Sequence, residues 1–477
     1  MPTKISPTQF RILSGLYLVI VYSFGIFSRS AWSDDYPSLL DPSGNALFAA
    51  RNGRPVCGWV AQVLFSQFDS IAALVVIRLI GFIGLLMLND LLVRNFLRSE
   101  VSIRVAMAVT IAFTLPSFQF SSHWATAYMM SWSAYLAVLG LELSKASRVN
   151  IKLLGTLALV CSLLFYPLFS FFLFAYIYAL WFVKSQPIKL LITELLRGVY
   201  LVIICSGLAY LFSVIYLTLY NSTFNPRVGV VSISALSDKL FFFATRPFAL
   251  TYRPFFIDSP STKALLISLF GFVTLLLFLF WRKNRSVTTT LIQFLLFNVV
   301  VILTLTPLIF VSENQIDMRF VAPNTWLFAF VVMFSLFPKD LERSKNTKIF
   351  NKFRFAFLGL SLVVGMISIN LNFINLYLKP YHVKEAFIGQ QLALCSAEKV
   401  RNKISIVERS IPWENRNNIG VYSQQTDLES AWVPIGAVFY YLRNIGLETD
   451  SLSITADEES QDNVCLVVLD EYPRLYG

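Results

Sequence analysis

The sequence predicts a polytopic α-helical membrane protein that ends in a small α/β domain, and three observations lead to this fold class. Hydrophobic residues make up 56% of the 477-residue chain and charged residues only 14%, whereas a soluble protein carries about 25% charged residues. The apolar residues gather in runs long enough to cross a bilayer, which takes about 20 helical residues. From about residue 380 onward these runs stop and the chain becomes acidic.

Ten apolar stretches are candidates to cross the membrane. One of them, 153–183, carries no charge over 31 residues and is interrupted by Tyr166-Pro167. The others have the length of single spans. They cover residues 11–28, 70–93, 102–118, 122–141, 190–219, 263–281, 288–311, 320–337 and 355–378.

Lysine and arginine set the orientation of these spans, because the cytoplasmic loops of membrane proteins are enriched in both. With the N-terminus inside, the basic clusters at 94–104, 145–152, 184–197 and 282–285 all fall inside, but only if 153–183 crosses the membrane twice. Each of its two legs is short for a span, so we expect a short or re-entrant hairpin that turns near Pro167. The prediction is about 11 spans, with the N-terminus in and the C-terminal region out.

Two domains follow from this layout. Residues 1–379 form the transmembrane domain, whose long outer loops are 29–69 and 220–262, and residues 380–477 form an extracytoplasmic α/β domain. In the second domain, short apolar runs predict strands at 403–407, 419–422 and 464–469, and 428–443 predicts a helix.

Charge and cysteine content narrow the function classes. A net charge of +11 fits either a nucleic-acid binder or a membrane protein with basic cytoplasmic loops. Because the basic residues lie beside the apolar runs, we expect the second and no nucleic-acid partner. The five cysteines show no CxxC spacing, which argues against a metal site, although Cys395 and Cys465 could pair in an oxidising compartment. No nucleotide-binding or metalloprotease motif is present.

Two adjacent carboxylates, Asp34 and Asp35, follow the first apolar stretch. Carboxylates this close raise each other's proton affinity, which suits a general base. The alternative is a structural role, because Ser33-Asp34-Asp35 could equally cap a helix. The pair is the strongest candidate for catalysis in the chain.

Arg51 and Arg54 follow in the same loop, on a mildly amphipathic stretch, 45–66, that could lie along the membrane surface. The guanidinium fork suits phosphate oxygens, so both arginines are candidate phosphate ligands. Contact with lipid headgroups is the alternative.

Later outer segments add further candidates. Arg246 and Arg253 lie among aromatic residues in the loop 220–262, where they could hold a phosphate or only anchor the loop to the membrane. Glu313 and Arg319 lie in a tight loop, where Arg319 could hold the leaving phosphate and Glu313 could contact the substrate. The alternative is a self-neutralised turn. His123 and Trp124 could contact a phosphate or a sugar; a structural histidine and an aromatic belt are the alternatives.

The arrangement of these residues resembles the GT-C class of polyprenyl-phosphate-sugar-dependent glycosyltransferases over nearly the whole chain. Asp34-Asp35 followed by Gly53-Arg54-Pro55 is similar to the phage-type O-antigen glucosyltransferases that convert bacterial serotype. This narrower resemblance covers only the first outer loop.

The resemblance implies an inverting transfer at the periplasmic face of the bacterial inner membrane. The donor would be a sugar, expected to be glucose, on undecaprenyl phosphate, and the acceptor a hydroxyl of lipid-linked O-antigen. One of the two aspartates would take the acceptor proton, and arginines would hold the leaving phosphate. No metal or other cofactor is expected, and a donor synthase and a flippase are the expected protein partners, beside the membrane lipids.

Three other functions stay open. An O-antigen polymerase is also polytopic and has arginine-rich outer loops. A flippase or transporter of the same lipid would place charges inside the spans, where Arg78 is the clearest example. A surface receptor would not need a base beside phosphate-binding arginines.

Overall fold

The computed structural model describes most of the helical part of the chain. The described residues are 6–28, 31, 35–97, 103–229, 231–248, 251, 262–311, 318–335, 359–360, 362–367, 369–371, 374, 378, 382, 386, 389–390, 393, 403–407, 453–455 and 465–468.

Five helices in this part of the chain are long and apolar enough to cross a membrane, so the protein is an α-helical membrane protein. They are Pro7–Ile26 (α1), Leu74–Leu97 (α5), Pro167–Lys184 (α10, Pro167–Ser170, with α11, Phe172–Lys184), Ile188–Leu219 (α12) and Val287–Ile309 (within α16, Val287–Phe310). The other apolar helices are Ile103–Ala112 (α6), Pro116–His123 (α7), Met129–Ser144 (α8), Val149–Phe165 (α9), Thr262–Asn284 (α15) and Ala322–Ser335 (α17).

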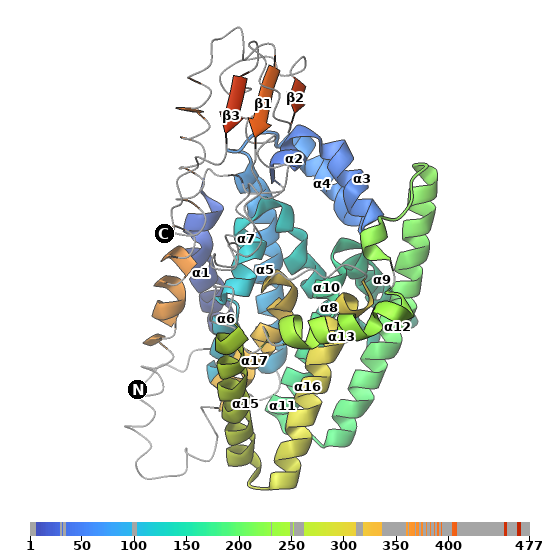
Figure 1. The fold of residues 1–477 in the computed structure, drawn as a ribbon. Coiled ribbons are helices and arrows are strands. Elements are labelled where there is room, and N and C mark those ends of the chain that lie inside the picture. The colour runs from blue at the N-terminus through green and yellow to red at the C-terminus, as the bar shows by residue number, and fades with distance from the viewer. Residues whose placement is uncertain are drawn as a thin grey trace.

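Short helices lie between these apolar ones. Three of them, Asp35–Leu40 (α2), Pro42–Arg51 (α3) and Pro55–Gln67 (α4), fill the first predicted outer loop. Figure 1 shows them at one end of the helical body, with the turn between α15 and α16 at the other end. The remaining short elements are Ala125–Ala127 (η1), Pro226–Val228 (η2), Ile233–Ala235 (η3), Leu236–Phe243 (α13), Ala244–Phe248 (η4, a π-helix) and Met318–Val321 (η5).

The interruption that the sequence predicted near Pro167, within 153–183, is present as a break in the helix. α9 ends at Phe165, Tyr166 is extended, and Pro167 begins the next helix at a position that suits proline. Ser162 before the break donates to Ser170 after it, at 2.7 Å, which closes the turn between α9 and α10.

The structure differs from the sequence prediction at 102–118, which is not one continuous helix. α6 ends at Ala112, a turn follows, and Pro116 begins α7, which runs on to His123. Proline cannot donate the backbone hydrogen bond that a helix interior requires, so it favours a new start here. The segment placed outside by the sequence, 118–123, is therefore largely helical.

Polar and small residues hold the apolar helices together. Ser133 on α8 bonds Ser162 and Ser170 across the hairpin, and such contacts join helices in a membrane, where apolar surface gives no preference for a neighbour. Gly140 on α8 and Gly155 on α9 meet so closely that a Cβ on either would lie within 3 Å of the other's carbonyl oxygen. This contact needs glycine on both helices.

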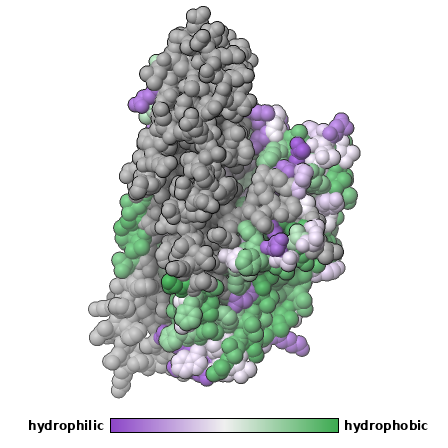
Figure 2. Space-filling model, in the orientation of Figure 1, coloured by the Kyte–Doolittle hydropathy of each residue, from purple (hydrophilic) through white to green (hydrophobic). Residues whose placement is uncertain are grey.

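Apolar side chains also cover the outside of the helical body, as Figure 2 shows over its lower half. Examples are Ile203 on α12, Ile267 on α15 and Leu295 on α16, each more than 60% exposed. Exposed apolar surface of this extent marks a membrane-facing surface.

Segments that are distant in the sequence contact each other at both ends of the described helical part. At one end Arg11 on α1 pairs with Asp90 on α5 at 2.6 Å, and Lys283 on α15 donates to the carbonyl of Phe182. At the other end the backbone of Asn225 donates to the carbonyl of Arg51 at 2.8 Å, which joins the two long loops predicted to lie outside. Basic clusters predicted inside and loops predicted outside therefore occupy opposite ends.

Three strands are described in the C-terminal region. They are Lys403–Val407 (β1), Ser453–Thr455 (β2) and Cys465–Val468 (β3), in a parallel sheet of order β2-β1-β3. The first and third lie where the sequence predicted strands, and the second was missed because three residues are too short for an alternation pattern. The predicted strand at 419–422, the predicted helix at 428–443 and the Cys395 partner of the predicted pair lie outside the described residues.

Candidate active site

Asp35 is the candidate catalytic residue that the structure describes, and it is completely buried. It is the first residue of α2, the short helix that comes after α1 in the chain. Its Oδ1 accepts a hydrogen bond from the backbone N–H of Thr126 in η1, at 2.9 Å. A carboxylate inside a protein needs such donors, so this bond anchors the first predicted outer loop on the turn between α7 and α8. Asp34 lies outside the described residues.

Arg78 brings a positive charge to the same end of the molecule. It is 1% exposed, and its Nη1 donates to the carbonyl of Ser28, just after α1, at 2.6 Å. It lies in the first two turns of α5, so it is near the end of the helix and not at its middle. In the sequence analysis, Arg78 was considered only as a charge of the kind that a transporter places inside a span. An arginine near the start of an apolar helix needs a partner, and this signal could have placed it in the site.

His123 lies beside this group and is fully buried. Its ring packs on Tyr22 of α1, with the ring centroids 5.6 Å apart, and occupies the space that a side chain at Gly25 would need. Burial, and then the charge of Arg78, lower the pKa of His123 below its usual value near 6.5. The imidazole is therefore neutral, and it holds α7 against α1; its contact with a substrate stays a prediction.

The burial of His123 leads to a pH-dependent stability. In the unfolded chain the ring takes up a proton as the pH falls through about 6.5, and the folded chain does not, so folding stability falls with the pH in this range. We expect the free energy of unfolding of His123→Gln to depend less on pH than that of the wild-type protein, by at most about 1.4 kcal/mol per pH unit. Thermal unfolding measured between pH 5 and pH 7 tests this, with His382→Gln as a control at an exposed histidine. Equal slopes in the wild-type protein and His123→Gln would contradict it.

Trp124 is also buried, at 2% exposure, at the start of η1. It is one of the largest fully enclosed side chains and belongs to the hydrophobic core. The structure thus places Trp124 next to the turn that binds Asp35, but inside the packing of the helices.

The stretch 45–66, which carries Arg51 and Arg54, is divided between two helices. α3 ends at Arg51, the chain turns at Gly53 with φ +75°, and α4 begins at Pro55 and folds back on α3. A positive φ is readily adopted only by glycine. At Gly58 the two helices are so close that a Cβ would lie 2.3 Å from the carbonyl oxygen of Ala46.

The turn directs its two arginines to different neighbours. Arg51 reaches the second loop predicted to lie outside, where its Nε donates to the carbonyl of Thr223 at 3.2 Å. Arg54 lies over the ring of Tyr166, 5.1 Å from its centroid, in a cation–π contact with the turn of the α9–α10 hairpin. Neither guanidinium forms an ion pair with a carboxylate of the described residues.

Lys239 is a buried cation in the loop 220–262, and the sequence analysis did not select it. It is 3% exposed on α13, with its ammonium 5.3 Å from the centroid of Phe242, while Leu240 and Phe241 point outward. This side-chain pattern fits a helix lying in the membrane surface. A lone lysine within an apolar, aromatic run was the signal available for it.

The structure gives only backbone positions for two other predicted phosphate ligands. Arg246 lies in the π-helix η4, a form of helix often found at functional sites, and Arg319 lies in η5. Arg253 and Glu313 lie outside the described residues. No group of three or more metal-binding side chains occurs in the described part of the chain.

Comparisons with protein-family models, with curated proteins and with solved structures found no match. A function therefore has to be proposed from the residues of the site and their geometry.

Proposed function

We propose that the protein is an inverting glycosyltransferase that moves a sugar, expected to be glucose, from undecaprenyl phosphate to a hydroxyl of lipid-linked O-antigen. The observation that supports it best is Asp35, a buried carboxylate anchored on Thr126, at the end of the molecule where the two long loops meet. A carboxylate with this surrounding is held in one orientation, as a general base or its immediate support requires.

The reaction would use the aspartate pair and the arginines in separate roles. The proton of the acceptor hydroxyl passes to a carboxylate of Asp34-Asp35 as its oxygen bonds the anomeric carbon. The bond from that carbon to the phosphate oxygen breaks, and the electron pair leaves with the phosphate. Because the phosphate gains negative charge, fixed guanidinium groups stabilise the transition state more than the bound donor.

Arg54 is the best placed of the predicted phosphate ligands, because it directly precedes α4 and lies over the ring of Tyr166 at the same end as Asp35. Arg51 joins the two loops, while Arg246, Arg253 and Arg319 come from later outer segments. The proposal includes about 11 spans in the inner membrane, an N-terminus in the cytoplasm, and a periplasmic α/β domain after residue 380.

Arg54→Ala is expected to weaken use of the donor. A charge-assisted hydrogen bond contributes about 1.5–3 kcal/mol, so kcat/KM for the polyprenyl-phosphate sugar should fall about tenfold to a hundredfold. The kcat/KM of Arg54→Lys should lie between those of the wild-type protein and Arg54→Ala, because lysine keeps the positive charge but lacks the forked guanidinium group. Arg148→Ala, at an exposed position beside α9 and far from the turn, is the matched control. Unchanged donor kinetics in Arg54→Ala would mean that this side chain only packs on Tyr166.

The function is tested by analysing the lipopolysaccharide of a deletion strain and its complemented parent. A missing side-branch hexose, restored by the wild-type gene, supports the proposal. Loss of O-antigen chain length would instead identify a polymerase, and loss of all lipid-linked intermediates at the outer face would identify a flippase. Unchanged lipopolysaccharide would reject an O-antigen substrate.

A further inference from the structure

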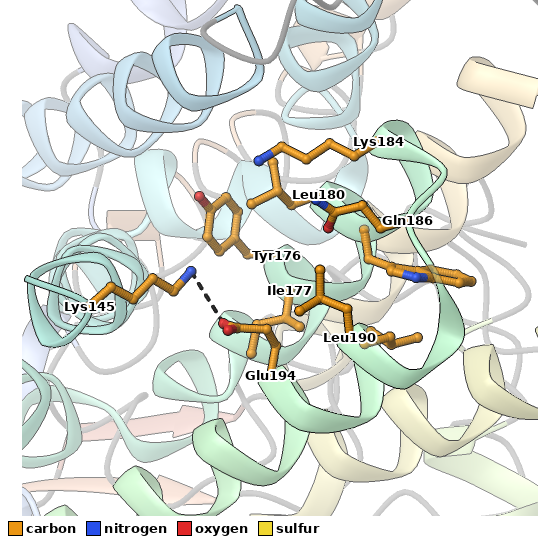
Figure 3. Close-up of a pocket in the computed structure, with 10 residues that line it drawn as sticks. Lys145, Tyr176, Ile177, Leu180, Lys184, Gln186, Leu190 and Glu194 are labelled. Carbon is orange, nitrogen blue, oxygen red and sulfur yellow. Dashed lines mark ion pairs between the residues drawn. The ribbon is translucent and has the colours of Figure 1, made fainter.

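A half-open cavity of about 190 Å³ lies at the end of the molecule opposite Asp35, where α8, α11 and α12 meet. Polar side chains line one part of it, and four aliphatic side chains and Trp181 line the rest. Figure 3 shows Lys145 facing Glu194 across the cavity, with Tyr176 and Lys184 around it. With about 30 Å³ for each water molecule, the volume holds roughly six, so it fits a phosphate group and not an acyl chain.

Charged side chains from four helices surround this cavity, and positive charge is in excess. Lys145 pairs with Glu142 at 2.8 Å and lies 3.5 Å from Glu194. Lys184, at the end of α11, takes part in no ion pair of the described residues. The basic side chains of the cavity and its surroundings are Arg94, Lys145, Lys184 and Arg197, and the acidic ones are Glu142 and Glu194.

Hydrogen bonds fix the frame around the cavity. Asn95 on α5 donates to the hydroxyl of Tyr176, and that hydroxyl donates to Glu142 at 3.1 Å. Arg197 on α12 donates to the carbonyl of Ser144 at 2.7 Å. The Nε of Arg94 is buried and has no hydrogen-bond partner among the described residues. The frame is therefore preformed, and Lys184, which lines the cavity, is left to contact an anion.

Exposed apolar side chains of α12 border the cavity. Leu190 lines it and is 39% exposed, and Ile192 and Leu196, on the same stretch of α12, are exposed as well. Lys184 and Lys189 belong to the basic clusters that the sequence places on the cytoplasmic side. Basic pockets between transmembrane helices on this side suit anionic lipid headgroups.

We propose that this cavity binds the phosphate-bearing headgroup of an anionic phospholipid of the inner leaflet, with the acyl chains lying along the exposed face of α12. Lys145 and Lys184 contact the phosphate, and the aliphatic part of the cavity holds the glycerol end of the lipid. The site is separate from the proposed transferase site, and it does not depend on that activity.

The test uses purified full-length protein in vesicles of phosphatidylcholine, with or without phosphatidylglycerol. Native mass spectrometry should show one phosphatidylglycerol retained per chain, and thermal unfolding should move upward with this lipid. Lys184→Gln and Lys145→Gln should each weaken retention about fivefold, as expected for one lysine near an anionic lipid. Lys152→Gln is the matched control, because Lys152 is an exposed basic residue of the same end that does not line the cavity.

Each other outcome overturns the proposal. If the wild-type protein does not prefer phosphatidylglycerol to phosphatidylcholine, the cavity holds no anionic headgroup. If Lys152→Gln loses retention as much as Lys184→Gln, the lipid binds diffusely to the basic surface. If inorganic phosphate added in detergent protects the protein equally well, the site binds a free anion and not a lipid. If Lys145→Gln fails to fold, lipid retention by Lys184→Gln alone decides the test.

Discussion

Asp34→Asn and Asp35→Asn, made separately, are expected to leave the protein in the membrane while at least one of them abolishes sugar transfer. A general base contributes roughly 10²–10⁴ in rate, so the affected variant should lose at least about 100-fold in activity. Asparagine at position 35 keeps an oxygen that can accept from the N–H of Thr126, so the anchor of the loop is retained. The measurement is transfer from undecaprenyl phosphate-linked glucose in isolated membranes.

Two further substitutions separate catalysis from anchoring. Asp35→Ala removes the acceptor and leaves the N–H of Thr126 unpaired, which costs about 1–3 kcal/mol of stability. Asp41→Asn is the matched control, because Asp41 is an exposed N-cap whose carboxylate accepts from Gly44, and asparagine caps a helix equally well. Full activity in both Asp34→Asn and Asp35→Asn would remove the proposed base. A loss of stability in Asp35→Ala without any loss of activity in Asp35→Asn would make Asp35 an anchor only.

Gly155→Val is expected to give the largest loss of stability. A Cβ at this position would lie 2.8 Å from the carbonyl oxygen of Gly140 and 2.9 Å from the backbone nitrogen of Ser144. Backbone atoms cannot turn aside, so α8 and α9 must separate, and overpacking of this kind costs about 1–3 kcal/mol. The separation would also strain the hydrogen bonds between Ser133 and Ser162.

The measurement is thermal unfolding in detergent, followed by size-exclusion chromatography. Gly207→Val is the control, because Gly207 lies in α12 and no atom comes within 4 Å of a Cβ placed there. Both variants put the same side chain into an apolar helix, so a difference between them reports the contact of α8 with α9. If Gly155→Val is as stable as Gly207→Val, the two helices do not pack through their glycines.

The helical class and the helix break at Tyr166-Pro167 could be predicted because they depend on neighbouring residues. An apolar run forms a helix in a membrane because its backbone must satisfy its own hydrogen bonds. Proline at 167 interrupts that pattern wherever the helix lies in the molecule. The break of 102–118 at Pro116 was missed, although the same rule would have found it.

The candidate site could be predicted only in part. Asp35, Arg51 and Arg54 stood out because charged residues are rare in this chain, but their neighbours did not. The fold-back of α4 on α3 depends on the close approach at Gly58, which no local pattern reveals. Lys239 gave too weak a signal, since one lysine in an aromatic run has many explanations.

The sequence by itself determined that the chain is a helical membrane protein, that its charges gather in a few loops, and where its helices are broken by Tyr166-Pro167. The tertiary structure decided that Asp35 binds Thr126, 91 residues further along the chain, and that Arg51 reaches Thr223, 172 residues away. The physical reason is that hydropathy and proline act within a helix, whereas these pairs form only when helices pack and bring their ends together.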